Sequence, residues 1–349
     1  MKTIRRLSVC LVLTRWCIGL VAGGLSFGLL SASAQPHYKL TILAVHGTCV
    51  SMNNGGQIVG FRLIAPTEKP TPYIFGGGVE HDISNLYCYP IQINDVGQFI
   101  ANGLGTSNQL IPLVRDANGK VVKLPYLSGT TQYTLWAINS SGTVVGRDYN
   151  SDGSVSLGFV YQNNKISALP VIQGHTFVSA HCINTAGQIV AQYRYNNDPN
   201  QRRAAIITGT QMQDLGTYSG GTDIQPFAMN DNDEVVGIGS EVIQNGIVVP
   251  SAFLYSGGQI QPVGPWVPTG INNSSQAVGY KFAGSGITTN IAVLYAGGKL
   301  TDLNTLIEPL DSNVHIYSPL AINDSGEILA LCWVSNDVHK EHSCVLTPQ

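Results

Sequence analysis

The chain has 349 residues and a formal net charge of −3 at pH 7, and only 11% of its residues are charged. Because this balance supplies no basic surface, we expect no nucleic acid among its partners. Asn, Gln, Ser, Thr and Gly are abundant instead, which is common in exported β proteins and suits contact with sugars.

The first 34 residues have the features of a secretory signal peptide. Lys2, Arg5 and Arg6 precede an apolar run from about Trp16 to Leu30, and small residues follow from Ser31 to Ala34. Removal of this segment leaves 14 basic and 21 acidic side chains, a net charge of −7. Arg15 interrupts the apolar stretch, so we expect no membrane span. The mature chain, residues 35–349, is therefore expected to be secreted or periplasmic.

A short phrase recurs seven times at intervals of 41 to 51 residues. Each copy reads as an apolar residue and Asn, two turn residues, Gly or a substitute, and then an apolar strand. The interval is the size of one four-stranded propeller blade. We therefore predict an all-β fold, a seven-bladed β-propeller of four-stranded blades forming a single domain. The seven asparagines are Asn53, Asn94, Asn139, Asn184, Asn230, Asn272 and Asn323.

The last copy of the repeat stops after its third strand, residues 343–347, because the sequence ends at Gln349. Near the other end, Lys39–Leu43 resembles Lys299–Leu303, which reads as a fourth strand. We expect residues 38–43 to pair in the last blade and to close the ring without a covalent link. This pairing leaves no open sheet edge at that place.

The phrase Ile-Asn-x-x-Gly-x-Val-Val-Gly, clearest at Ile138–Gly146, resembles the repeat of the HAF family of extracellular repeat proteins. The resemblance covers essentially all of the mature chain. The His-Ala-Phe that names the family is only partly kept, for example as Ser251-Ala252-Phe253. The resemblance implies a secreted, propeller-like protein, and the family has neither an established common activity nor catalytic residues to carry over.

The two faces of such a ring are expected to differ. Turns after the first and third strands share one face and stay short, whereas the loops between second and third strands share the other face with the interblade links. These loops vary in length and chemistry, as a binding surface built on a repeated scaffold does. They are Leu63–Pro72, Tyr149–Ser156, Tyr195–Arg203, Glu241–Pro250 and Val334–His342.

The interblade links place aromatic, His and acidic residues just before or within the inner strands, where we expect them to ring a central funnel. They form either a stacking platform for a sugar or a peptide side chain, or aromatic packing between the blades. The candidate ligand-binding residues are Tyr133, Trp136, His175, Phe177, Asp223, Phe227, Trp266, His315 and Tyr317.

A possible calcium loop begins at Asp148. Asp148, Asn150, Asp152 and Ser154 alternate along the chain as oxygen ligands do, and Gly153 permits a sharp bend. The twelfth position is Phe159 rather than the usual Glu. The segment is therefore either a calcium site completed from elsewhere or an ordinary polar hairpin.

Five cysteines remain after the signal peptide, so at least one is unpaired. Cys332 and Cys344 fall on two strands that we expect to be adjacent. They are the disulfide candidates in an oxidising compartment.

No sequence motif identifies a reaction. The first hypothesis is a secreted, monomeric, non-enzymatic binding or adhesion protein that recognises a glycan or a protein through its variable-loop face. The rival is a carbohydrate-active hydrolase or lyase with a funnel-mouth site, which requires Asp223, His175, His181 or His315 to converge. A third possibility is a scaffold whose funnel is plugged by its own apolar side chains.

Overall fold

The computed structural model describes residues 36–349 except 44–46, 65–68, 84, 107–108, 199–200, 219–220, 222, 243–247, 284–289, 310–312 and 336–340. The predicted signal peptide, residues 1–34, lies outside the described residues, as do parts of the predicted variable loops. Among the described residues, no helix has the length and apolar character that a membrane crossing needs.

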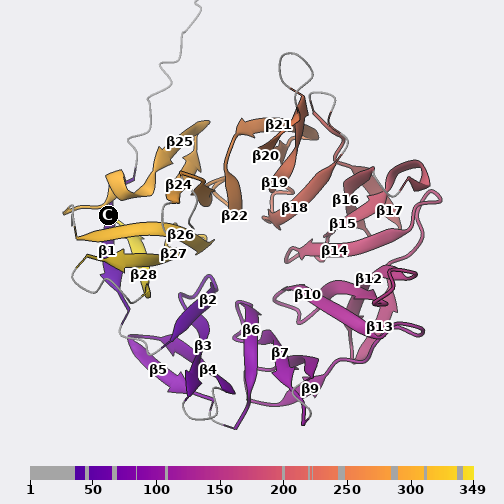
Figure 1. Ribbon diagram of the computed structural model, residues 1–349, viewed down its shortest axis with the longest axis horizontal. Helices are drawn as coiled ribbons and strands as arrows, with labels where there is room; N and C mark the ends of the chain where they lie inside the picture. The colour runs from indigo at the N-terminus through magenta and orange to yellow at the C-terminus, as the bar shows by residue number, and fades with distance from the viewer. Residues whose placement is uncertain are drawn as a thin grey trace, which may run out of the picture. The chain divides into compact units, whose positions relative to one another are not determined.

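Residues Pro36–Gln349 form seven antiparallel, four-stranded sheets around a central axis (Figure 1). The predicted seven-bladed β-propeller is confirmed. From the innermost strand outward, the first three blades are β2 (Thr48–Met52), β3 (Ile58–Ile64), β4 (Lys69–Gly76) and β5 (Val79–Asp82); β6 (Cys88–Ile93), β7 (Phe99–Leu104), β8 (Leu110–Arg115) and β9 (Val121–Lys123); and β10 (Gln132–Ile138), β11 (Val144–Tyr149), β12 (Ser156–Gln162) and β13 (Lys165–Ala168).

The next three blades repeat the same order. They are β14 (Phe177–Ile183), β15 (Ile189–Arg194), β16 (Arg202–Thr208) and β17 (Gln211–Asp214); β18 (Ile224–Met229), β19 (Val235–Val242), β20 (Val248–Ser256) and β21 (Gln259–Gly264); and β22 (Val267–Ile271), β23 (Ala277–Lys281), β24 (Ile291–Ala296) and β25 (Lys299–Asp302). Within the described part of the chain, two short 3-10 helices, η1 (Tyr195–Asn197) and η4 (Leu303–Leu306), lie in connections.

The seventh blade joins the two ends of the described chain. Its strands are β26 (Val314–Ile322), β27 (Ile328–Val334), β28 (Glu341–Pro348) and, outermost, β1 (Tyr38–Ile42). In the antiparallel pair of β1 and β28, Tyr38 lies opposite Pro348 and Ile42 opposite Cys344. The side chain of Tyr38 is fully buried in the core of this blade. The predicted closure by residues 38–43 is confirmed.

The repeated Asn builds the turn between the first and second strands of each blade. In all seven copies its Oδ1 accepts the backbone N–H of the residue four positions later. The residue before that donor has positive φ in every copy. Five copies use Gly there, because Gly adopts this conformation without steric cost, whereas Asp233 and Ser275 adopt it in the other two.

The same Asn side chains also hold neighbouring blades together. At five junctions the Nδ2 of one Asn donates to the main-chain oxygen of the next blade's Asn, over 2.8–3.0 Å. All seven Asn side chains are buried, with 2–5% of their surface exposed. Because a buried amide without partners is costly, these bonds fix both the turn and the spacing of the blades.

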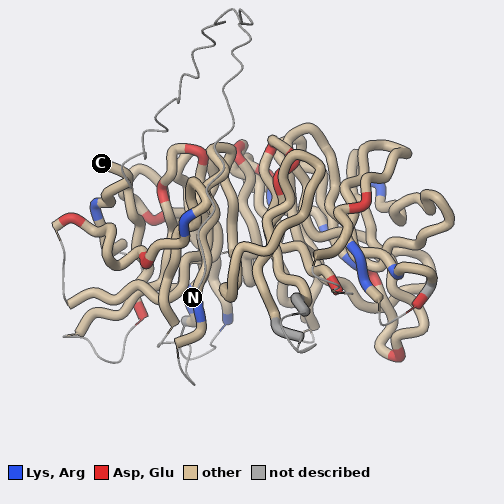
Figure 2. Tube along the Cα trace, turned by 90° about the horizontal axis from the view of Figure 1, so that it is seen from above, with Lys and Arg blue, Asp and Glu red and all other residues tan. Residues whose placement is uncertain are grey.

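Charged residues are sparse along the trace of the propeller, as the edge-on view shows (Figure 2). The apolar cores lie between adjacent blades, so each sheet is covered on both faces. One such core packs Ile100 of the second blade against Leu135 and Phe159 of the third.

Candidate functional site

A β-bulge in each innermost strand aims one residue at the central axis. The register of the first two strands shifts by one residue three positions before each repeated Asn. The extra residues all line a chamber of about 290 Å³ on the axis. We call them the bulge ring: Val50, Ile91, Trp136, His181, Phe227, Thr269 and Leu320. In a β-bulge two residues of one strand lie opposite a single residue of the neighbouring strand, which changes the direction of the side chain of the extra residue.

Trp136 and Phe227 are the two predicted ligand-binding residues that reach this chamber. Trp136 is 40% exposed, and its ring stacks on that of His181 with 4.8 Å between the centroids. Burial lowers the pKa of His181 to about 4, so the imidazole is neutral at pH 7. Its Nε2 has no hydrogen-bond partner within the described ranges.

Several other predicted funnel residues pack between the blades instead. Phe177 is 2% exposed and meets Tyr193 edge-on, and the His175 ring lies 4.6 Å from the same tyrosine. Trp266 is 3% exposed, stacks on Tyr295 and donates its Nε1–H to a main-chain oxygen. The expectation that Phe177 and Trp266 face the funnel is wrong, because interblade packing covers them.

The two predicted ligand-binding residues of the seventh blade, Tyr317 and His315, also contact other parts of the protein. Tyr317 is 2% exposed, stacks on Trp333 and donates its hydroxyl to the Glu341 carboxylate. His315 contacts the main-chain oxygen of Asn290 through Nε2 at 3.2 Å. Tyr317 is therefore also a packing residue rather than a funnel residue.

The residues required by the enzymatic hypothesis have separate partners. Asp223 accepts two hydrogen bonds from the guanidinium of Arg202 at 2.9 and 3.1 Å. His175 lies on a tyrosine, His181 on a tryptophan and His315 on a main-chain oxygen. Across the described ranges, no hydrogen bond or ring contact joins any two of these four residues.

Tyr133 lies in a different hollow, between the second and third blades, at the ends of the strands where the loops and links gather. This tyrosine pocket has a volume of about 350 Å³, and none of the described residues that line it is charged. Tyr126 and Tyr133 meet edge-on with centroids 5.9 Å apart. The lining is Asn102, Leu110, Tyr126, Thr131, Gln132, Tyr133, Thr134, Leu135 and Tyr149.

The hydroxyl of Tyr133 is buried and has no hydrogen-bond partner among the described residues. Burial raises its pKa well above the usual value, and the neighbouring Tyr126 and Tyr149 raise it further. The phenol is therefore a neutral donor and acceptor at physiological pH. Tyr126 remains 40% exposed at the rim.

Asp148 fixes one wall of the tyrosine pocket. Its side chain is 1% exposed, and its Oδ2 accepts the N–H of Leu127 at 2.6 Å and the hydroxyl of Thr130 at 3.3 Å. Burial raises the pKa of this carboxyl, and the two hydrogen bonds oppose the rise. Because Leu127 follows Tyr126 directly, this carboxylate holds the segment that carries the exposed ring.

The other predicted calcium ligands make local contacts. Asp152 accepts the N–H of Ser154 at 2.9 Å, and Asn150 donates to the hydroxyl of Ser154 at 3.4 Å. Among the residues that the structure describes, no group of three or more His, Cys, Asp or Glu could hold a metal ion. Calcium at this hairpin stays a prediction.

Cys332 and Cys344 lie on the neighbouring strands β27 and β28, as predicted. Their register is offset, since Cys332 faces His342 and Cys344 faces Ala330. Both are buried free thiols, so the disulfide is not formed in this structure.

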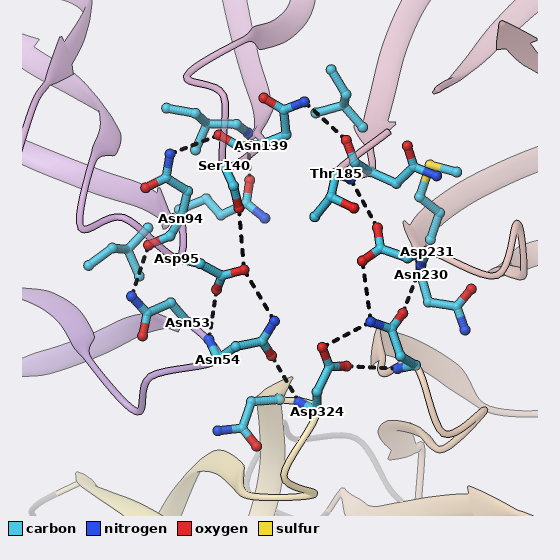
Figure 3. A pocket seen from close by; sticks show the side chains of 18 of the residues that line it. Asn53, Asn54, Asn94, Asp95, Asn139, Ser140, Thr185, Asn230, Asp231 and Asp324 are labelled. Carbon is cyan, nitrogen blue, oxygen red and sulfur yellow. Dashed lines mark hydrogen bonds between the residues drawn. The ribbon is translucent and has the colours of Figure 1, made fainter. Parts of the chain in front are cut away.

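A second polar ring lies at the mouth of the axial channel, where the first and second strands meet (Figure 3). It consists of the residue after each repeated Asn, and we call it the mouth ring. Hydrogen bonds join six of its seven neighbouring pairs, leaving open the pair of Ser140 and Thr185. Its members are Asn54, Asp95, Ser140, Thr185, Asp231, Asn273 and Asp324.

No family model matches the chain, and no curated protein matches it. Among solved structures it is similar to the β-propeller domain of the Trilobed protease from Pyrococcus furiosus, with a TM-score of 0.57 and 8% identity over 88% of this chain and 95% of that one. Virginiamycin B lyase from Staphylococcus aureus gives a TM-score of 0.50 and 12% identity, covering 89% and 99%. Tricorn protease gives 0.52 and 10%, covering 90% of this chain and 36% of that one. At these identities the similarity shows the propeller fold alone.

The sequence interpretation missed most of the tyrosine pocket. Tyr133 was selected, but Tyr126, Tyr149 and Asn102 were not, because they come from three separate elements. The available signal was Tyr126 in the interblade link, seven residues before Tyr133.

Proposed function

We propose that this protein is an exported, non-enzymatic binding protein that recognises a glycan through the tyrosine pocket. The observation that carries the proposal is the hydroxyl of Tyr133, which is buried without a partner among the described residues, in an aromatic-lined hollow. An unpaired buried hydroxyl is costly, and a ligand hydroxyl that bonds to it removes this cost. Export and membership of the HAF family belong to the same proposal and rest on the sequence.

The lining has the chemistry of a neutral, polyhydroxylated ligand. Asn102, Thr131 and Gln132 offer amide and hydroxyl groups that both donate and accept hydrogen bonds. Tyrosine rings offer apolar faces beside them. The volume of about 350 Å³ lies at the small end of ligand sites and suits one or two sugar units.

The pocket favours binding over hydrolysis. Glycoside hydrolysis ordinarily needs two carboxyl groups flanking the scissile bond. The described lining of the tyrosine pocket contains no Asp or Glu, and the nearby Asp148 side chain already accepts two hydrogen bonds from the Leu127–Thr130 segment.

The test is a glycan-array screen of residues 35–349, followed by calorimetric titration of the strongest ligand. We expect Tyr126→Ala to weaken binding by about tenfold, equivalent to roughly 1.4 kcal/mol, because a rim ring is lost. Tyr133→Phe is expected to weaken binding several-fold and to raise the melting temperature of the free protein slightly, because the variant no longer buries an unpaired hydroxyl. Tyr87→Ala is the matched control, since Tyr87 is similarly exposed at 42% and lies outside the pocket.

Two outcomes contradict the proposal. One is the absence of glycan binding by a folded wild-type protein, which moves the interpretation to a protein ligand. The other is glycan binding that Tyr126→Ala and Tyr133→Phe leave unchanged, which places the site elsewhere on the propeller.

A further inference from the structure

The mouth ring brings three carboxylates, Asp95, Asp231 and Asp324, to one opening on the axis (Figure 3). Figure 3 shows them on different sides of the opening, each bonded to a neighbouring side chain or main-chain group. No Lys or Arg belongs to the lining of the mouth, which has a volume of about 170 Å³. The described residues of the mouth thus provide negative charge without a counter-charge.

Neutral donors hold these carboxylates in place. Asp95 accepts from the N–H and the Nδ2 of Asn54 at 2.9 and 3.2 Å, and Asp324 accepts from both corresponding groups of Asn273 at 2.8 and 2.9 Å. Asp231 accepts from the N–H of Thr185 at 2.9 Å. Because these donors carry no formal charge, they leave the negative charge of the carboxylates uncancelled, and the ring attracts a cation.

An apolar collar lies directly inside the mouth ring. It consists of the residue before each repeated Asn, and all seven collar residues line the mouth. Five of them also line the axial chamber, so the two hollows lie on either side of the collar. The collar offers contact to an aliphatic chain rather than to a hydrated ion. Its members are Met52, Ile93, Ile138, Ile183, Met229, Ile271 and Ile322.

The chamber beyond the collar presents Trp136 and His181. The indole is 40% exposed, and an aromatic face of this kind attracts ammonium and guanidinium groups. His181 is 7% exposed and lines the chamber, and its Nε2 has no partner among the residues that the structure describes. This nitrogen can accept a hydrogen bond when Nδ1 carries the proton. This nitrogen is an observation independent of the mouth ring, and it indicates that a ligand in the channel donates a hydrogen bond to it.

The order along the axis is acidic ring, apolar collar, aromatic chamber. The mouth ring and the bulge ring lie four residues apart along the chain, a separation on the order of 10 Å in extended backbone. We propose that the channel binds an elongated organic cation, an aliphatic chain with a positively charged nitrogen group at each end. One end pairs with the mouth carboxylates, the chain crosses the collar, and the other end meets Trp136 and His181.

The test titrates the mature protein with spermidine while following tryptophan fluorescence, with 1,6-hexanediol as the uncharged probe. We expect saturable quenching by spermidine at micromolar to millimolar concentration and none by the diol. The double variant Asp231→Asn, Asp324→Asn is expected to weaken spermidine binding at least tenfold. Trp136→Phe is expected to abolish most of the signal and to weaken binding several-fold in calorimetry.

The matched control is the double variant Asp116→Asn, Glu308→Gln, which removes the same charge from residues outside the channel. It is expected to bind spermidine as the wild type does. Agmatine and a short arginine-containing peptide distinguish a free cation from a side chain presented by a protein, and binding of either supports the proposal. Equal loss in both double variants, or displacement of spermidine by calcium with no change in Trp136→Phe, overturns it. Neither result depends on the tyrosine pocket.

Discussion

The two ends of the blades differ in how closely the seven copies resemble one another. At the turn end, all seven copies of the Asn make the same hydrogen bond and use the same backbone conformation. At the link end, the junctions are packed by different residues, for example by Phe177 in the core between the third and fourth blades and by Trp266 in the core between the fifth and sixth. The repeat is therefore kept where every blade must hold its neighbour. A hollow such as the tyrosine pocket forms where the junctions differ.

The largest change in stability is expected in the seventh blade, where β1 and β28 pair without a direct chain connection. The N–H of Leu43 donates to Ser343, so the alternation of an antiparallel pair turns the N–H of Thr41 toward β28 and that of Ile42 away. Thr41→Pro is expected to lower the free energy of unfolding by about 3 kcal/mol. Ile42→Pro, which removes no ladder bond, is expected to cost clearly less. Equal losses in urea titrations would show that closure does not depend on this ladder.

The turn end can be tested directly with Asn139→Ala. This change leaves the N–H groups of Ser141 and Thr143 and the main-chain oxygen of Asn184 without their partner. We expect a loss of about 2–3 kcal/mol in the free energy of unfolding. The control is Asn118→Ala at an exposed hairpin, with an expected change below about 0.5 kcal/mol. If both variants lose a similar free energy of unfolding, the repeated Asn contributes no more than an ordinary turn residue.

The axial chamber makes stability depend on pH through His181. Its pKa is lowered to about 4 in the folded state, chiefly by burial, so the unfolded chain binds more protons between pH 4 and about 6.5. Stability from this group is present above pH 6.5 and is lost as the pH falls. Between pH 7 and 4.5 the loss is about 2 kcal/mol.

The check on this prediction is the difference in unfolding free energy between the two pH values. His181→Phe, which cannot titrate, is expected to show a loss smaller by about the same amount. His37→Asn is the control, since the side chain of His37 is about half exposed. If His181→Phe keeps the full dependence on pH, the dependence arises from other groups.

The smallest effect is expected at the wall of the tyrosine pocket. Asp148→Ala removes the acceptor for Leu127 and Thr130, but it also removes a buried charge, so we expect a net loss of about 1 kcal/mol. Asp148→Asn keeps an acceptor and is expected to lose less. The melting temperature with calcium or with a chelator decides the calcium prediction, because a bound ion stabilises the wild type and not Asp148→Asn.

The architecture was readable from the sequence because each blade carries its own turn signal. The spacing of the asparagines predicted seven blades, and the likeness of Lys39–Leu43 to Lys299–Leu303 predicted the outermost strand of the last one. Both segments are indeed outermost strands, β1 and β25. Local turn chemistry and strand order are properties that short stretches of sequence contain.

The side-chain directions were not readable, because the bulges reverse the alternation of inward and outward residues. Trp136 reaches the axis only because the register shifts between Leu135 and Ala137. Trp266 precedes β22 and is buried in the core between the fifth and sixth blades, although its place in the link looked equivalent. A bulge has no fixed residue signature, so sequence selected the right region and misplaced several of its side chains.

The pairing of β1 with β28 has a consequence for how this chain is connected. The N–H of Gln349 donates to the main-chain oxygen of His37 at 2.9 Å, so the two ends of the domain touch. A short peptide joining them would make the backbone circular, and the chain could then be opened at an exposed hairpin such as Gly77-Gly78 in another blade. In such a circular permutant, the blade built from both ends of the chain is a different one, and every strand keeps its neighbours.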